Sequence, residues 1–403
     1  MALGCGESST GNKPPQETLA AAAGTPNSTA AKPALEPPTF LAAEELAEGW
    51  ISLFDGRTLF GWKAASDANW DVQDGAIVVS HGKPGLLCTT AQFADYVLKV
   101  DFRAASGTNS GIFLRTTPVV GKEDITTKCY ELNIAPPDNP FPTCSLVGRK
   151  KADGNFESDD WQTFEVTVEG PKVLVKLGGK EVLEYDDPQP IGRGHIGLQL
   201  NSGKCEFRNI KLKPLGVKEL FNGKDLTGWK NHPDSKSKFT VTPAGELNVQ
   251  DGRGCLESEQ SFGDFVVQLE CISHAKNLNS GLFFRCIPGE FMNGYESQIH
   301  NGFKEDDRTQ PIDHGTGGIF KRAVARWVVP NDLEWFHKTI VCDGPHIAVW
   351  VNGYQVTDWT DDRKPDKNPR NGLHVEPGTL QIQGHDPTTN LSFRNLRAVE
   401  LSK

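Results

Sequence analysis

Three side chains on one short stretch of the chain are of the types that acid–base chemistry uses. Residues 295–300 read YESQIH. Because successive side chains on a β-strand alternate between its two faces, Glu296, Gln298 and His300 should point the same way. An imidazole beside a carboxylate is suited to proton transfer near neutral pH. We therefore predict that this strand carries the working face of the protein.

A polar turn that runs into an apolar strand lies a short distance upstream. It begins at Asn279 and ends on a cation, Arg285. The guanidinium of Arg285 could pair with Glu296 or hold a substrate oxygen. We expect the two strands to share one site, in which Asn279, Arg285 and Gln298 bind and orient substrate oxygens.

The chain repeats itself at a long interval. The segment LFDGRTLFGWK at 53–63 returns as LFNGKDLTGWK at 220–230. Repeats in solenoid proteins are 20 to 50 residues long, so a longer period indicates duplication of a whole domain. We predict two tandem domains at 48–215 and 216–403.

The composition and the residue patterns favour β-structure throughout both copies. The chain has 403 residues with 41 Gly and 26 Pro, and short segments such as 93–103 and 262–272 alternate apolar and polar residues. Asn352-Gly353 is typical of a tight hairpin turn. The sequence predicts an all-β protein made of two jelly-roll sandwiches.

Residues 1–47 differ in composition from the rest. Repeated Ala, Pro, Thr, Ser and Gly cannot bury enough apolar surface to fold, so we predict a disordered tether. The first residues, MALGCG, are similar to the end of a bacterial lipoprotein signal, in which Cys5 would be lipidated. The charged and long apolar regions that precede such a cysteine are missing, so either translation starts further upstream or the match is chance. A lipid anchor in the periplasm or cell envelope is the expectation, and a cytoplasmic location is the alternative if Met1 is the true start.

The charge and the cysteines narrow the range of partners and compartments. A formal net charge of −10 excludes a nucleic-acid partner, because phosphates require a basic surface. Nine cysteines without a CxxC spacing do not predict a zinc site. Four cysteines in each copy leave both disulfides and buried free thiols open.

Landmarks shared by the two copies resemble one known family. They are the Phe-(Asp/Asn)-Gly…Gly-Trp opening, the Asn-Ser-Gly-x-Phe-x-Arg strand, the Tyr-Glu strand, the Gln-containing strand that ends in Gly-His in the second copy, and the closing Phe-Arg-Asn. Together these segments resemble the 3-keto-disaccharide hydrolase domain family. The resemblance implies a fold like concanavalin-type lectins and glucanases, a carbohydrate ligand on a concave sheet, and hydrolysis of glycosides oxidised at C3.

The two copies differ at the positions that can titrate. His300 corresponds to Ala135 in the first copy, and His385 corresponds to Asn201. Without these imidazoles the first copy offers a poor acid–base pair. We therefore expect the second copy to be catalytic and the first copy to bind sugar or serve as a packing partner.

The family resemblance implies a reaction in which a base removes the C2 proton and the C1 leaving group departs. Glu296 or His385 would be the base and His300 the acid, an assignment that the sequence leaves open. Gln383 shares a face with His385 and would bind substrate. Arg394 is a secondary candidate, because it could reach the cleft or tie down the last strand. A conventional retaining glycosidase and a lectin without turnover are the alternatives.

A long loop in the second copy could hold a metal ion. Residues 301–321 include three aspartates and a histidine, and loops of this length are usually functional or disordered. Carboxylates and backbone carbonyls suit Ca²⁺. The loop residues that could bind Ca²⁺ or simply be solvated are Asp306, Asp307, Asp313 and His314.

Overall fold

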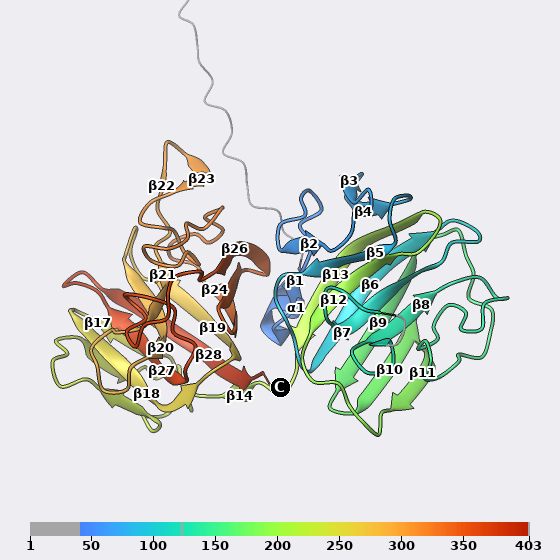
Figure 1. Cartoon of the computed structure of the whole chain (residues 1–403). Helices are drawn as coiled ribbons and strands as arrows, with labels where there is room; N and C mark the ends of the chain where they lie inside the picture. The colour runs from blue at the N-terminus through green and yellow to red at the C-terminus, as the bar shows by residue number, and fades with distance from the viewer. Residues whose placement is uncertain (1–40, 122–123, 402–403) are drawn as a thin grey trace, which may run out of the picture. The chain divides into compact units, whose positions relative to one another are not determined.

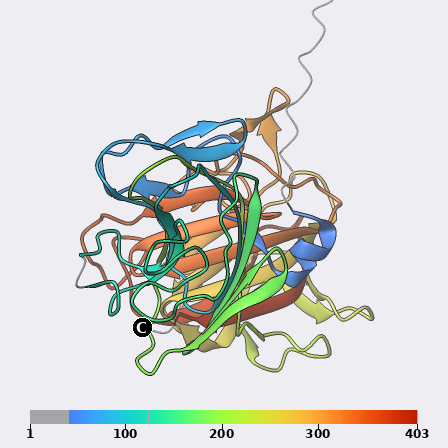
Figure 2. The ribbon, with the colours of Figure 1, turned by 90° about the vertical axis from the view of Figure 1, so that its right-hand side faces the viewer.

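The fold is described from a computed structural model covering residues 41–121 and 124–401. Cys5 and residues 1–40 of the predicted tether lie outside the described residues, so the lipidation site stays a prediction. The described residues form two pairs of antiparallel sheets, each pair with an eight-stranded and a five-stranded sheet. Figures 1 and 2 show these strands as twisted ribbons. The all-β prediction is confirmed.

The first half contains strands β1 to β13. Its eight-stranded sheet has the order β11-β10-β9-β6-β13-β4-β3, with β1 paired to β13, and its five-stranded sheet has the order β2-β5-β12-β7-β8. The bounds are β1 Ile51–Ser52, β2 Trp62–Ala64, β3 Asp71–Gln73, β4 Ala76–Val79, β5 Gly85–Thr89, β6 Tyr96–Ala104, β7 Ser110–Thr116, β8 Tyr130–Ile134, β9 Gln162–Glu169, β10 Lys172–Leu177, β11 Lys180–Asp186, β12 His195–Leu200 and β13 Cys205–Pro214.

The second half repeats this topology. Its eight-stranded sheet has the order β16-β17-β28-β19-β24-β25-β26, with β14 paired to β28, and its five-stranded sheet has the order β15-β18-β27-β20-β21. The bounds are β14 Lys218–Glu219, β15 Trp229–Asn231, β16 Lys238–Val241, β17 Leu247–Gln250, β18 Gly254–Phe262, β19 Phe265–Ser273, β20 Ser280–Cys286, β21 Tyr295–Ile299, β22 Phe303–Lys304, β23 Asp307–Pro311, β24 Phe336–Asp343, β25 His346–Val351, β26 Tyr354–Thr360, β27 Gly378–Gly384 and β28 Asn390–Glu400.

Each sandwich buries one face of its five-stranded sheet and leaves the other face for a site. In β20, Leu282 and Phe284 join the main apolar core of the second half. Phe283, between them in sequence, lies on the opposite face in a separate cluster with Met292. This period of two follows from the strand pleat. It directs every second residue of β20 and β21 away from the core.

The predicted tether ends earlier than residue 47. Residues Ala43–Glu48 form a helix, α1. Glu45 and Glu48 make ion pairs of 2.9 Å with lysines of β13, Lys211 and Lys213, and Leu41 just before the helix is buried. These contacts order a segment whose composition alone indicated disorder. No helix in the described part of the chain is long and apolar enough to cross a membrane.

The described cysteines are all free thiols. Eight cysteines between Cys88 and Cys342 are buried and unpaired in the described residues. Of the two alternatives that the sequence left open, the structure therefore has buried thiols.

Candidate active site

The site of the second half is built on the outward face of its five-stranded sheet. Strand register places Glu296 of β21 opposite Phe283 of β20, and Phe283 opposite Gln381 of β27. Gln298 of β21 lies opposite Gly281 of β20 in the adjacent row. The strand alternation predicted for Glu296 and Gln298 is therefore present, and both side chains line one pocket.

This pocket has a volume of about 470 Å³, within the usual range for small-molecule sites. Six residues that the sequence singled out line it, together with charged and aromatic groups that it did not. The lining residues are Arg253, Asn279, Phe283, Glu290, Phe291, Met292, Asn293, Glu296, Gln298, Asp313, Phe320, Arg370, Gln383 and His385.

A glycine makes room for the buried carboxylate. A Cβ on Gly281 would lie only 2.8 Å from Oε1 of Glu296, far inside contact distance. The glycine lets the Glu296 side chain lie over the neighbouring strand. Glu296 is 5% exposed, and burial raises the pKa of this carboxyl to about 7, while Arg370 and His385 both act to lower it. Glu296 is thus a carboxyl that can change its protonation state near neutral pH.

Arg370 supplies a cation beside Glu296. Its Nη2 lies 3.6 Å from Oε2 of Glu296, and its guanidinium lies 4.9 Å from the centre of the Phe283 ring. The guanidinium also donates to the backbone oxygen of Met292. A cation held this way can stabilise negative charge that develops close to the carboxylate.

Asp313 fixes the amides of the site. Its Oδ2 accepts hydrogen bonds from Nδ2 of Asn279 (2.5 Å) and Nε2 of Gln298 (3.0 Å). With their amide groups oriented, Asn279 and Gln298 can present fixed polar atoms to a ligand. The sequence presents Asp313 only as a loop residue that could bind Ca²⁺ or be solvated. No group of three or more His, Cys, Asp or Glu in the described residues is arranged to hold a metal ion, so Ca²⁺ stays an expectation without support from this loop.

His385 stands at the end of β27 with one ring nitrogen occupied. Its Nδ1 lies 2.8 Å from Oδ2 of Asp386, and its side chain is 42% exposed. An aspartate at Nδ1 fixes the orientation of the ring. This arrangement leaves Nε2 as the nitrogen that can exchange a proton with a ligand.

His300 is not among the described residues that line the pocket. It follows β21, is 8% exposed, and its Nδ1 accepts a hydrogen bond from the backbone N–H of Gly302 at 3.2 Å. Burial lowers the pKa of the His300 imidazole. The ring is therefore disposed to stay neutral. Asp313 and His385, which line the pocket, both act on the pKa of this ring, so His300 lies near the pocket without lining it.

Arg285 lies outside the pocket, contrary to the sequence interpretation. A bulge in the pairing of β20 with β27 interrupts the alternation before this residue, and Arg285 has a φ of 48°. The fully buried guanidinium pairs with Asp264 at 2.7 Å and donates to backbone oxygens. Arg115 makes the equivalent ion pair with Asp95 in the first half. This arginine is architectural in both copies.

Arg394 also lies away from the pocket. It belongs to β28 in the eight-stranded sheet, where it pairs with Glu270 at 2.7 Å and stacks over Trp335 at 4.1 Å. Arg208 stacks over Trp161 at 3.9 Å in the first half. Of the two roles considered for Arg394, tying down the last strand is the one that the contacts fit.

A buried lysine supports the strand that carries the site. Nζ of Lys338, on β24, donates to the backbone oxygens of Ser297 (2.9 Å) and Gln298 (3.0 Å). Burial lowers the pKa of this amine to about 7. Lys338 contacts β21 from the core side and holds its backbone in place beneath the pocket.

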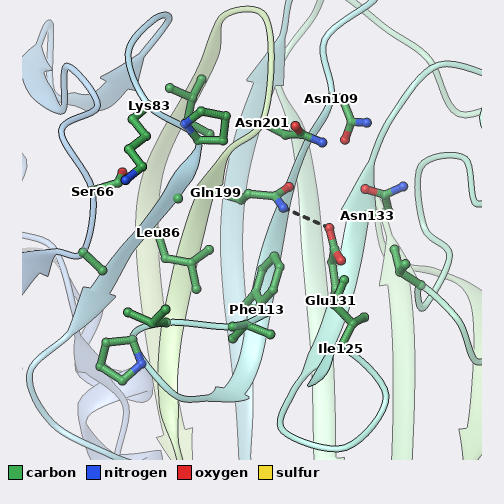
Figure 3. Close-up of a pocket in the computed structure, with 18 of the residues that line it drawn as sticks. Ser66, Lys83, Leu86, Asn109, Phe113, Ile125, Glu131, Asn133, Gln199 and Asn201 are labelled. Carbon is green, nitrogen blue, oxygen red and sulfur yellow. Dashed lines mark hydrogen bonds between the residues drawn. The ribbon is translucent and has the colours of Figure 1, made fainter. Parts of the chain in front are cut away.

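The first half has a pocket at the equivalent place, with a different chemistry (Figure 3). Glu131 lies opposite Phe113 there, as Glu296 lies opposite Phe283. Nε2 of Gln199 donates to Oε1 of Glu131 at 3.1 Å, and burial raises the pKa of Glu131 to about 7. Asn201 occupies the position of His385. The carboxylate is thus retained, but in the described residues no histidine lines this pocket.

Comparisons with known proteins found similar sequences and solved structures. Over 230 residues it is 29% identical to a 3-keto-disaccharide hydrolase of Bacteroides thetaiotaomicron, covering 42% of this chain and 79% of that protein. A solved structure from Parabacteroides distasonis shares 22% identity and a TM-score of 0.39, covering 43% of this chain and 98% of that one. The carbohydrate binding module CBM66 of Bacillus subtilis shares 14% identity and a TM-score of 0.31, covering 38% of this chain and 94% of that one.

The family match covers most of the chain and occurs twice, once in each half. It spans residues 49–213 and residues 216–398, and the family is described as the 3-keto-alpha-glucoside-1,2-lyase-like domain. The repeated landmarks in the sequence and the repeated sheet order agree with this match. The chain belongs to the family of 3-keto-alpha-glucoside-1,2-lyase-like domains and contains two of them.

Proposed function

We propose that the second half cleaves glycosides that carry a ketone at C3, by elimination across C1 and C2 followed by addition of water. The observation that carries this proposal is the position of Glu296 between a cation and an imidazole. Arg370 lies 3.6 Å from its carboxylate, and both Arg370 and His385 lower the pKa of Glu296. Family membership supports the same chemistry. The name of the hydrolase from Bacteroides thetaiotaomicron supports the 3-keto substrate and the net hydrolysis.

The reaction requires one base, one oxyanion partner and one acid. A ketone at C3 acidifies the proton on C2. The base takes that proton, and the electron pair of the broken C2–H bond forms an enolate with the C3 ketone. The enolate then reforms the ketone, the C1–C2 double bond forms, and the C1–O bond breaks. The leaving oxygen takes a proton from the acid. Water adds across the double bond, with hydroxyl at C1 and hydrogen at C2, so the net reaction is hydrolysis.

Glu296 fits the base. Its pKa of about 7 means that a large fraction is ionised at neutral pH while the carboxylate stays basic. Arg370 fits the oxyanion partner, because C3 adjoins C2 and the guanidinium lies 3.6 Å from the carboxylate. Asn279 and Gln298, whose amides are fixed by Asp313, fit the remaining hydroxyl groups.

His385 fits the acid in place of His300. Asp386 holds the ring of His385 through the 2.8 Å contact at Nδ1, which leaves Nε2 to give a proton to the leaving oxygen on C1. His385 lines the pocket together with Glu296 and Gln383.

Deuterium labelling distinguishes elimination from direct hydrolysis. The purified protein is given a 3-keto-glucoside in D₂O, and the released 3-keto-glucose is analysed early in the reaction. Elimination and hydration place deuterium at C2, whereas direct displacement at C1 retains hydrogen there. Free 3-keto-glucose incubated with the protein is the control for exchange after release. Absence of turnover on 3-keto substrates, or cleavage of unoxidised glucosides with hydrogen kept at C2, would overturn the proposal.

A further inference from the structure

The pocket of the first half is larger than that of the second and is divided into a polar and an apolar part. Its volume is about 580 Å³. Figure 3 shows Asn109, Asn133, Asn201 and Gln199 gathered around Glu131, with Leu86 and Phe113 lying to one side. A single bound molecule would therefore meet amides at one end and hydrocarbon at the other.

The polar part has hydrogen-bond acceptors without partners. Oδ1 of Asn133 and Oε1 of Gln199 are buried and accept no hydrogen bond, and Asn133 is 3% exposed. Buried acceptors without a donor are costly, and such exceptions in native proteins usually have a reason. Hydroxyl groups are both donors and acceptors, so a sugar can satisfy these amides and the neighbouring carboxyl together.

The apolar part comes from a segment that is longer in the first half. Asn109 to Tyr130 spans 21 positions, whereas the matching interval from Asn279 to Tyr295 spans 16. Val119, Val120 and Ile125 of this longer segment line the pocket. Val119 is 75% exposed, the highest value among the exposed large apolar residues of the described chain. An apolar side chain held in solvent at the rim of a pocket suits contact with an apolar ligand group.

The charges of the two pockets also differ. Arg370 and His385 beside Glu296 have no charged or titrating counterparts next to Glu131 among the described residues. Asn201 stands at the position of His385, and Gln199 contacts Glu131. Lys83 lines the first pocket, but Figure 3 shows it across Gln199 from Glu131. This site suits binding of a neutral polyol better than stabilisation of an enolate.

We propose that the first half is a binding site for neutral, unoxidised glycosides with an apolar aglycone, the sugar lying on the amides and the aglycone against Leu86, Phe113 and Val119. The site would hold an intact glycoside on the same chain that cleaves its oxidised form. The proposal is independent of turnover in the second half, because an unoxidised glycoside has no C3 ketone to acidify C2.

Titration calorimetry on the full chain tests the proposal with 4-nitrophenyl glucoside as the probe. We expect one site that binds this probe at least about tenfold more tightly than methyl glucoside, because the aryl group adds apolar contact. Gln199→Leu should weaken both ligands about fivefold or more. Val119→Asp should weaken the aryl ligand and leave methyl glucoside nearly unchanged.

A matched substitution in the second half shows which of the two pockets binds 4-nitrophenyl glucoside. Gln383→Leu, at the position equivalent to Gln199, should leave the affinity for 4-nitrophenyl glucoside unchanged. Thermal melting of Gln199→Leu checks that the first half stays folded, and Val119 is exposed enough for its replacement to be tolerated. The proposal is overturned if the full chain binds no 4-nitrophenyl glucoside, or if Gln383→Leu abolishes binding while Gln199→Leu does not. Neither result would bear on the cleavage of 3-keto substrates, which is measured separately.

Discussion

Glu296 and Glu131 are equivalent carboxyls in different surroundings. Both are buried, and burial raises the pKa of each to about 7. Arg370 and His385 are coupled to Glu296, whereas an amide, Gln199, contacts Glu131. At the scale of single residues, the neighbours of the carboxyl distinguish the proposed catalytic site from the proposed binding site.

Replacing His385 by the residue of the first half tests its role. His385→Asn removes a titrating group and keeps a hydrogen-bonding side chain, so kcat on a 3-keto-glucoside should fall by about a hundredfold or more. The fold should be unaffected, since the side chain of His385 is 42% exposed. The matched change Asn201→His should give the first half no activity, because no cation among the described residues of that pocket lies beside Glu131 as Arg370 lies beside Glu296. Near-normal turnover of His385→Asn would remove His385 from the mechanism.

The pH dependence tests the pairing of Arg370 with Glu296. If Glu296 is the base, kcat/KM should rise with pH through about 7 as the carboxyl ionises. Arg370 lowers the pKa of Glu296, so Arg370→Met should move this rising limb to higher pH as well as reduce kcat. Arg253→Gln, which removes another cation of the pocket, should move the limb less. A limb that stays in place in Arg370→Met would show that the two groups are not coupled in the working enzyme.

At the scale of elements, two insertions complete the site of the second half. The interval that carries Asp313 spans 40 positions, from Tyr295 to Trp335. The matching interval of the first half, from Tyr130 to Trp161, spans 31. The interval that carries Arg370 is also longer in the second half. It spans 48 positions from Trp335 to Gln383, whereas the matching interval from Trp161 to Gln199 spans 38. The sheet is common to both halves, and the inserted loops supply groups that have no counterpart in the described lining of the first pocket.

The loop that carries Arg370 is held by a second arginine. The guanidinium of Arg363 pairs with the carboxylate of Asp361 at 2.8 Å and donates to the backbone oxygens of Pro369 and Gly372. Arg363→Ala should therefore lower kcat about tenfold or more by freeing Arg370, with faster hydrogen exchange confined to residues 361–373. Arg363→Lys should not restore activity, because a lysine cannot reproduce the planar set of donors. Unchanged kcat together with faster exchange would separate the order of the loop from catalysis.

At the scale of the whole molecule, the buried carboxyls should lower stability as they ionise. The folded-state pKa of Glu296 is about 7, above the ordinary value of 4.5. Its contribution to stability is therefore fully present below pH 4.5 and is lost as pH rises through about 7. Glu296→Gln should raise the free energy of unfolding at pH 8 by on the order of 2 kcal/mol, and the gain should vanish near pH 4.

Urea denaturation of the wild type, Glu296→Gln and Glu131→Gln across pH 4 to 8 measures these differences. Glu131→Gln is the matched variant and should show the same trend, since burial also raises the pKa of Glu131 to about 7. A Glu296→Gln protein that is less stable than the wild type at pH 8 would contradict the raised pKa. Greater stability together with lost turnover would show that the carboxylate is kept for chemistry at a cost in stability.

The sequence by itself determined the features that depend on local periodicity and on repetition. Alternation along a strand placed Glu296 and Gln298 on one face, and two copies of the same landmarks predicted two all-β sandwiches of one family. Comparison of the copies also marked His385, because Asn201 stands in its place. The same comparison did not correct the prediction that Arg285 binds substrate, although Arg115 stands at the matching position of a copy without the histidines.

Only the tertiary structure decided the positions that depend on contacts distant in sequence. A bulge turned Arg285 into the interior, pairing within the eight-stranded sheet took Arg394 away from the pocket, and loop packing brought Asp313 and Arg370 beside β20 and β21. A bulge or a loop conformation is fixed by partners far along the chain, such as Asp264 for Arg285 and Met292 for Arg370. Residue spacing carries no record of such partners, whereas strand alternation follows from the local geometry of the backbone itself.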